Sequence, residues 1–313
     1  MARAFVFPGQ GSQAVGMGSA LAEASPAARE VFEEVDDALG QSLSRLMFEG
    51  PGDELTLTEN AQPALMAHSM AVFRVLEREG GVSLPASCLY LAGHSLGEYS
   101  ALTAAGSFRL ADTARLLKLR GQAMQGAVPV GAGAMAALLG LDFEQVAEVA
   151  RDAAEGDVCD PANDNAPGQV VVSGDRAAVE RAVALAKARG ARRAILLDVS
   201  APFHCSLLQP AADAMAEALD AVDMQDPSVP LVANVTAQPV ESAAGLLDLL
   251  VRQVTATVRW RESMMFMRDD DVDRVVELGS GKVLSGLARR IDREMSGVSV
   301  EGPDDIEALL KEL

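Results

Sequence analysis

The chain has 313 residues and a formal net charge of −19. This length suits one large domain, or a large domain with a smaller companion. The negative charge argues against nucleic acid as a partner, because binding of phosphates needs a basic face. The three cysteines, Cys88, Cys159 and Cys205, are too few and too irregularly spaced for a disulfide framework or a metal site.

The N-terminus opens directly on a short apolar segment instead of the longer apolar run of a secretion signal. No stretch reaches the ~20 apolar residues that cross a membrane as a helix. Sparse cysteines suit a reducing compartment. We therefore expect a cytoplasmic protein that binds neither membrane nor nucleic acid, and we expect it to be a monomer.

Short apolar segments alternate with helical patterns through most of the chain. The predicted strands are residues 4–7, 88–92 and 274–278. The predicted helices are residues 61–78, residues 100–105 and a helix from Lys282. Strands that alternate with helices indicate an α/β fold with a parallel sheet.

The middle of the chain has a different order of elements. Asp142, with Gln145 three residues later, has the pattern of a capping box, and Asp175 is expected to cap a helix through Ala188. The predicted strands here are residues 133–140, 157–159, 169–173 and 194–199. The order βαββαβ is typical of ferredoxin-like units. We expect an inserted small subdomain at 127–198, and a large domain formed by 1–126 and 199–313.

Residues 93–97, with the sequence Gly-His-Ser-Leu-Gly, lie between a predicted strand and a predicted helix. This is the pattern of a nucleophile elbow in an α/β-hydrolase-like core. Ser95 would lie on a tight turn, where the flanking glycines relieve crowding of the backbone. Free N–H groups after the nucleophile, starting with that of Leu96, can stabilise an oxyanion. The pattern predicts Ser95 as a nucleophile.

A serine nucleophile needs a base, and the chain has three histidines. His68 lies inside a predicted helix, where a structural role is simplest, and His94 is interpreted as an orienting residue that packs at the elbow. His204 follows Pro202 in a loop, so elimination makes it the general base. No aspartate lies in an obvious orienting motif, and a backbone carbonyl could hold the imidazole instead. These residues leave esterase and transferase both open.

The chain resembles the malonyl-CoA:acyl-carrier-protein transacylases, the loading enzymes of fatty-acid synthesis, along nearly its full length. Seven ordered motifs carry the resemblance: residues 7–13, 93–99, 119–121, 165–169, 201–204, 253 with 258–260, and 277–284. The chain departs from the family pattern at Thr257 and Ser280, where the family usually has proline. These departures change the stiffness of loops rather than the chemistry.

The resemblance implies a role for each matching residue. Ser95 would form the acyl-enzyme, and His204 would act first as base and then as acid. The backbone N–H groups of Gln10 and Leu96 would form the oxyanion hole. The backbone carbonyl of Gln253 would orient His204, although this glutamine alone has the character of a surface residue.

Substrate choice is also implied by the resemblance. Arg120 would bind the free carboxylate of the malonyl group through its planar guanidinium, with a surface arginine as the simpler alternative. Phe203 resembles the bulky residue of malonyl-selective enzymes, so we expect malonyl to be preferred over methylmalonyl. Asn165 and Gln169 either order a loop at the domain junction or contribute to binding.

The predicted function is transfer of a malonyl group from malonyl-CoA to the phosphopantetheine thiol of acyl carrier protein, with ping-pong kinetics and no metal or cofactor. Three alternatives stay open: a discrete acyltransferase of a polyketide synthase, a serine thioesterase or hydrolase, and a catalytically silent interaction protein. Intact Ser95 and His204 argue against the last. Because the carrier protein is acidic, we hypothesise a basic docking rim at the cleft, formed by Lys187, Arg189, Arg192 and Arg193.

Overall fold

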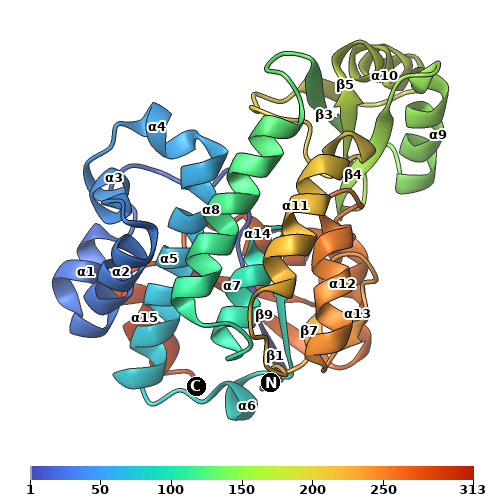
Figure 1. Cartoon of the computed structure of the whole chain (residues 1–313). Coiled ribbons are helices and arrows are strands. Elements are labelled where there is room, and N and C mark those ends of the chain that lie inside the picture. Colours follow the sequence, from blue (N-terminus) through green and yellow to red (C-terminus); the bar gives the residue numbers. More distant parts are fainter. Residues whose placement is uncertain (1) are drawn as a thin grey trace.

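The computed structural model describes residues 2–313 and contains two separate β-sheets (Figure 1). The six-stranded sheet has the order β10-β9-β1-β2-β7-β8, and the four-stranded sheet has the order β4-β5-β3-β6. In the larger sheet all neighbours pair in parallel except β7 and β8 at one edge. The predicted α/β fold with a mostly parallel sheet and a separate smaller sheet is confirmed.

The larger sheet and its helices are formed by the two ends of the chain. Its strands are β1 (Ala2–Phe7), β2 (Tyr90–Gly93), β7 (Leu231–Val232), β8 (Pro239–Val240), β9 (Val272–Leu278) and β10 (Ser296–Val300). The helices before the small sheet are α1 (Ser19–Ala24), α2 (Pro26–Leu39), α3 (Leu43–Glu49), α4 (Gly52–Thr56), α5 (Thr58–Arg78), α6 (Leu84–Ser87), α7 (Gly97–Ala104) and α8 (Leu110–Ala127). Those after it are η1 (Ser206–Leu208), α11 (Gln209–Asp220), α12 (Ala243–Gln253), α13 (Trp260–Asp269), α14 (Val283–Ile291) and α15 (Pro303–Leu310).

The small sheet comes from one continuous stretch and forms the lobe at the upper right of Figure 1. Its elements are β3 (Gly133–Leu139), α9 (Phe143–Ala154), β4 (Cys159–Ala166), β5 (Gln169–Asp175), α10 (Arg176–Ala188) and β6 (Arg193–Leu196). All neighbouring strands are antiparallel. This order and pairing are those of the split βαβ unit that the sequence predicts.

Strand β1 is buried on both faces, as expected for the centre of a parallel sheet. Phe5 and Phe7 belong to the apolar core on one face, whereas Ala4 and Val6 belong to the core on the other, with helices α13 and α14. Phe7 lies in register with Gly93 of β2. The loops that follow β1 and β2 therefore leave the sheet side by side at its carboxyl edge, where α/β sheets bind their ligands.

Two predictions about the smaller sheet need correction. Strand β4 begins at Cys159, where the predicted strand 157–159 ends, because its polar residues, such as the buried Asn163, hide the strand pattern in the sequence. Asp175 precedes α10 but does not cap it through its side chain, since its carboxylate accepts the N–H of Val158 at 2.8 Å. The capping box of Asp142 and Gln145 is confirmed.

Smaller differences lie at the ends of helices. Helix α5 begins at Thr58, three residues before the predicted start, and α7 begins at Gly97, immediately after the elbow. Within the described residues, no helix has the length and apolar character needed to span a membrane.

Candidate active site

Ser95 lies in the tight turn between β2 and α7, with a positive φ of 54°. A Cβ atom on Gly93 would lie 1.9 Å from the backbone of Gly97, and one on Gly97 would lie 2.2 Å from the carbonyl oxygen of Phe7. Only glycine fits at both positions, because real Cβ atoms do not approach other atoms so closely. The two glycines thus permit the strained turn that exposes the hydroxyl of Ser95.

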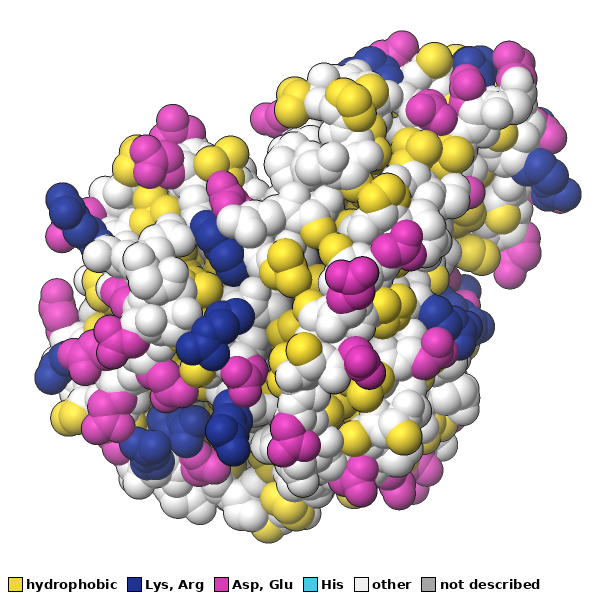
Figure 2. Space-filling model, in the orientation of Figure 1, with side chains coloured by type: hydrophobic (Ala, Val, Ile, Leu, Met, Phe, Trp, Pro, Cys, Tyr) yellow, Lys and Arg dark blue, Asp and Glu magenta, His cyan; other side chains and the backbone are white. Residues whose placement is uncertain are grey.

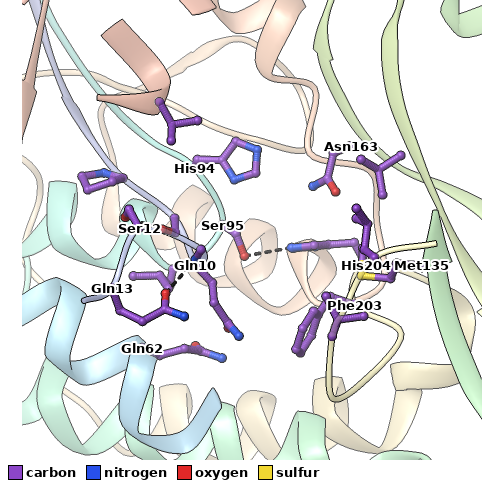
Figure 3. Close-up of a pocket in the computed structure, with 18 of the residues that line it drawn as sticks. Gln10, Ser12, Gln13, Gln62, His94, Ser95, Met135, Asn163, Phe203 and His204 are labelled. Atoms are coloured by element: carbon purple, nitrogen blue, oxygen red, sulfur yellow. Dashed lines mark hydrogen bonds between the residues drawn. The ribbon is translucent and has the colours of Figure 1, made fainter. Parts of the chain in front are cut away.

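His204 lies beside Ser95 in the cavity (Figure 3). Its Nε2 atom is 2.8 Å from Oγ of Ser95, and its Nδ1 atom is 2.8 Å from the backbone carbonyl oxygen of Gln253. A carbonyl accepts, so Nδ1 carries the hydrogen and Nε2 is free to take the serine proton. The orienting contact implied for Gln253 is present, and the structure brings all three residues together.

The ionisation of His204 is set by its surroundings. Burial, and next the positive charge of Arg120, lower the pKa of His204 from 6.5 to about 3. The imidazole is therefore neutral at neutral pH, which is the form that accepts a proton.

Two residues that line the same cavity as Ser95 have backbone N–H groups without a partner in the described part of the chain. Among residues 2–313, no hydrogen bond uses the N–H of Gln10 or that of Leu96. Gln10 lies in the loop after β1, where its side-chain oxygen accepts from the hydroxyl of Thr58 at 2.7 Å, and Leu96 is the N-cap of α7. Unpaired N–H groups at the start of a helix and in an adjacent loop are suited to bind an oxyanion.

Arg120 is not a surface residue, because only 1% of it is exposed. Its Nη2 atom donates to Oγ of Ser95 at 3.1 Å and to Oε1 of Gln253 at 2.8 Å, and its Nη1 atom donates to Gln62 at 2.7 Å. None of the ion pairs within the described part of the chain includes Arg120. A buried guanidinium without a carboxylate partner beside a nucleophile is suited to bind an anionic substrate.

Gln253 is also fully buried, contrary to the surface character that the sequence alone indicates. It is the last residue of α12, and the tertiary fold buries it next to the elbow. The sequence signal for this position lies only in the family motif, because an isolated glutamine at the end of a helix has no distinctive pattern.

Two residues of the site were missed as functional candidates. Asn234 is fully buried, and its side chain accepts the N–H of Ser95 at 2.8 Å and donates to the carbonyl of Gly93 at 2.7 Å. Glu98 accepts the backbone N–H of Asn234 at 2.9 Å and the amide of Gln253. Burial raises the pKa of Glu98 to about 7. Glu98 stands in the elbow motif, whereas no local pattern singles out Asn234.

Ser95, His204 and Arg120 line a cavity of about 470 Å³ between the two sheets, and Figure 2 shows the surface hollowed between α4 and the small lobe. Phe203 lies on its wall next to His204 and packs against Met135 of β3. The cavity combines apolar walls with a few polar groups, as small-molecule sites do.

Three further motif residues occupy the cavity wall. His94 is half-buried, its Nε2 atom lies 2.9 Å from Oδ1 of Asn165, and its ring lies 5.7 Å from that of Trp260. Gln169 accepts from Arg290 of α14 at 3.0 Å. His68, by contrast, lies outside this cavity, with Nε2 3.0 Å from the carbonyl of Glu301.

The two departures from the family pattern make hydrogen bonds that proline lacks the hydroxyl to form. Thr257 donates to the carbonyl of Pro161 at 2.6 Å, and Ser280 donates to the carbonyl of Ser12 at 2.7 Å. The second bond ties the loop before α14 to the loop that carries Gln10. No group of three or more His, Cys, Asp or Glu side chains in residues 2–313 is placed to hold a metal ion.

The four cations of the hypothesised docking rim do not line the cavity. Arg189 pairs with Asp152, whereas Arg192 and Arg193 are exposed and take part in no ion pair among the described residues. Arg193 and the cavity residue Gln169 both pair with Leu139 of β3, from its two sides, so two strand spacings, or about 10 Å, separate their backbones.

Comparison with known proteins identifies the class of protein first. The family model described as "Acyl transferase domain" matches residues 4–300, so the chain is an acyltransferase.

Two curated proteins named malonyl CoA-acyl carrier protein transacylase are similar along nearly their full length. The protein from Bacillus subtilis is 45% identical over 311 residues, which is 99% of this chain and 96% of that protein. The protein from Escherichia coli K12 is 46% identical over 308 residues, which is 98% of each. The chain belongs to the family of malonyl CoA-acyl carrier protein transacylases.

Solved structures agree with this assignment. An acyl-carrier-protein S-malonyltransferase from Bartonella henselae is 55% identical, with a TM-score of 0.97 over 100% of this chain and 99% of that one. A malonyl-transacylase in complex with a type II polyketide synthase acyl-carrier protein is 42% identical, with a TM-score of 0.96 over both complete chains.

Proposed function

We propose that this chain transfers a malonyl group from malonyl-CoA to the phosphopantetheine thiol of acyl carrier protein through an ester on Ser95. One observation carries the proposal: Oγ of Ser95 lies 2.8 Å from the imidazole of His204 and 3.1 Å from the buried guanidinium of Arg120. A nucleophile, its base and a binding site for a carboxylate thus meet at one point. Family membership supports the same reaction.

In the first half-reaction, Oγ of Ser95 attacks the thioester carbonyl while Nε2 of His204 takes its proton. The carbonyl oxygen becomes an oxyanion, which the N–H groups of Gln10 and Leu96 stabilise. When the C–S bond breaks, the thiolate of CoA takes the proton from His204. The products are malonyl-Ser95 and free CoA.

In the second half-reaction, the phosphopantetheine thiol gives its proton to His204 and attacks the ester carbonyl. The bond to Oγ breaks, and Ser95 recovers its proton from His204. Because one acyl-enzyme links the two halves, the kinetics are ping-pong. The chain's own acid, base and nucleophile account for every proton and bond, so the proposed reaction has no cofactor.

Two residues would set substrate choice. The guanidinium of Arg120 would bind the free carboxylate, which an acetyl group lacks. The ring of Phe203, together with Leu96, would crowd an α-methyl group and favour malonyl over methylmalonyl. Equal rates of loading from methylmalonyl-CoA and malonyl-CoA would contradict the role of Phe203.

The test of the function is the intact mass of the protein after mixing with malonyl-CoA. We expect a malonyl adduct on the wild type that is absent from Ser95→Ala. Free malonate without an adduct would favour the thioesterase or hydrolase alternative.

Supply of a polyketide synthase is a second candidate, because one similar structure contains a type II polyketide synthase carrier protein. Both functions use the same residues and differ in the acceptor. Parallel transfer assays with a fatty-acid carrier protein and a polyketide carrier protein would separate them through the ratio of kcat/KM.

We further propose that residues 127–198 form a small subdomain inserted into a large domain of 1–126 and 199–313, and that the protein acts as a monomer in the cytoplasm. The acidic carrier protein would dock beside the cavity on exposed cations that lack an acidic partner. Arg192 and Arg193 are two of them, and Arg290 beside Gln169 is a third.

A further inference from the structure

The side-chain amide of Gln253 lies between two buried groups of opposite charge. Its Nε2 atom donates to the carboxylate of Glu98, and also to the carbonyl of Ser95 at 3.0 Å. Its Oε1 atom accepts from Nη2 of Arg120 at 2.8 Å. Glu98, Arg120 and Gln253 are each at most 1% exposed, so water does not substitute for these contacts.

The chemistry of the two neighbours allows only one orientation of this amide. A guanidinium only donates hydrogen bonds, and the two carboxyl oxygens of Glu98 accept them from the N–H of Asn234 and the amide of Gln253. The NH2 end of Gln253 must therefore face Glu98, and the oxygen must face Arg120. Reversal of the amide would place two donors, or two acceptors, against each other.

Glu98 itself is held in place by the backbone. Its Oε1 atom accepts the N–H of Asn234 at 2.9 Å, and the side chain of Asn234 is in turn fixed between Gly93 and Ser95. One carboxylate oxygen is thus committed to the backbone, and the other is left for Gln253.

The amide also keeps the two charges apart. Glu98 and Arg120 form no ion pair within the described residues, although both are buried near each other. The carboxyl group of Glu98 therefore lies close enough to compensate part of the positive charge of Arg120, with the amide of Gln253 between them. No carboxylate accepts a hydrogen bond from the guanidinium within the described residues. These are the properties that a binding site for a ligand carboxylate needs.

We propose that Glu98 is a positioning residue: it holds the amide of Gln253 with its oxygen toward Arg120, and it thereby determines the selectivity for acyl groups that carry a carboxylate. This inference deepens the proposed function and rests on it.

Replacement of Glu98 by glutamine gives a sharp consequence. The oxygen of the new amide must accept the fixed N–H of Asn234, so its NH2 group faces the NH2 group of Gln253. Gln253 thereby loses the contact with Glu98 that fixes its amide, so its oxygen is no longer held firmly toward the guanidinium of Arg120. The orientation of Arg120 is lost, while the backbone carbonyl of Gln253 still holds His204.

The experiment measures rate constants for acylation of Ser95 by malonyl-CoA and by acetyl-CoA, followed by intact mass. We expect Glu98→Gln to lower the malonyl-to-acetyl ratio at least tenfold, and Gln253→Met to lower it similarly. In the double variant the ratio should equal that of Gln253→Met alone, because Glu98 acts through this amide. An unchanged ratio in Glu98→Gln, or independent effects that multiply in the double variant, would overturn the proposal.

Glu277→Gln is the matched control for loss of stability. Glu277 is fully buried and accepts two backbone N–H groups, from Leu284 and Ser285, away from Arg120. We expect it to lower the melting temperature and leave the ratio unchanged. If Glu98→Gln does not fold, the test uses Gln253→Met alone. An unchanged malonyl-to-acetyl ratio in that variant would overturn the role of the amide. Failure of the proposed function is distinct: the wild type itself would then give no malonyl adduct.

Discussion

At the scale of single residues, the site depends on charges that are buried and only partly compensated. Arg120 and His204 are both almost fully buried beside Ser95. Burial lowers the pKa of His204 and keeps its imidazole neutral, and Arg120 has no carboxylate to pair with among the described residues unless a ligand supplies one. The same desolvation therefore prepares both the nucleophile and the selection of the substrate.

Arg120→Ala should reduce kcat/KM for acylation by malonyl-CoA about 10- to 200-fold, because hydrogen bonds to charged groups contribute about 1.5–3 kcal/mol. Acylation by acetyl-CoA should fall less, since acetyl has no carboxylate to bind. The exposed Arg115 lies on the same helix and pairs with Asp112, so Arg115→Ala is the control and should leave both rates unchanged. Equal losses with both substrates would remove Arg120 from substrate selection.

The pH dependence of the reaction tests the base. Neutral His204 is the active form, so activity is present above its pKa and is lost as the pH falls through that pKa. With the pKa lowered to about 3, kcat/KM for acetyl-CoA should stay level between pH 8 and 5. Arg120→Ala removes a positive charge that lowers this pKa, so the acidic limb should move to higher pH. A profile of the variant that does not move, or that moves to lower pH, would contradict this electrostatic coupling.

At the scale of elements, the ends of parallel strands hold the reacting groups. The loop after β1 carries Gln10, the turn after β2 carries Ser95, and the segment after β7 carries Asn234, whose side chain holds the elbow. The three segments meet because β1, β2 and β7 are neighbours in the sheet.

Asn234→Ala should lower the free energy of unfolding by about 2–4 kcal/mol, because it leaves the N–H of Ser95 and the carbonyl of Gly93 without their buried partner. It should also lower kcat more than it changes KM, since the nucleophile is displaced while Arg120 remains. Urea unfolding and steady-state kinetics measure the two effects. Gln238→Ala, an exposed position nearby in the chain, should change neither.

Asp142→Ala tests an element far from the reacting groups. It removes the capping box of α9 and should lower the free energy of unfolding by about 1 kcal/mol in urea. Acylation of Ser95 should be unchanged, because α9 lines no part of the catalytic cavity. A clear loss of acylation would mean that the small sheet is coupled to the site through this helix.

At the scale of the whole molecule, the cavity lies where the two sheets meet. On the side of the larger sheet, Ser95 comes from the turn after β2 and Arg120 from helix α8, whereas the smaller sheet contributes Met135 and Val171 of its strands. The segment from Ser200 to His204 returns from the smaller sheet and brings the base to the nucleophile.

Docking of the carrier protein depends on how charge is distributed over the whole molecule, because an acidic chain must bind an acidic partner. The double change Arg192→Glu with Arg193→Glu should raise KM for acyl carrier protein several-fold, and more at low salt, since rim charges steer association. Acylation by malonyl-CoA should change less. Arg45→Glu, on the distant helix α3, is the control. Unchanged turnover with carrier protein would remove Arg192 and Arg193 from the docking surface.

Local sequence patterns were sufficient for most elements and for the tight turn that carries Ser95. Hydrophobic periodicity and glycine turns are short-range signals, so the α/β class, the βαββαβ order and the elbow of Ser95 could be predicted. Strand β4 was placed too short, because a strand with buried polar residues lacks the apolar pattern on which such predictions depend.

Burial and the meeting of distant residues were decided only by the tertiary structure. Arg120, Gln253 and Asn234 lie far apart in the sequence, and nothing local predicts that each is buried against Ser95. The network around Gln253 depends on three elements that pack side by side, since donors and acceptors acquire partners only when water is excluded. The sequence alone determined the tight turn between β2 and α7 that carries Ser95, whereas the packing determined which charges surround it.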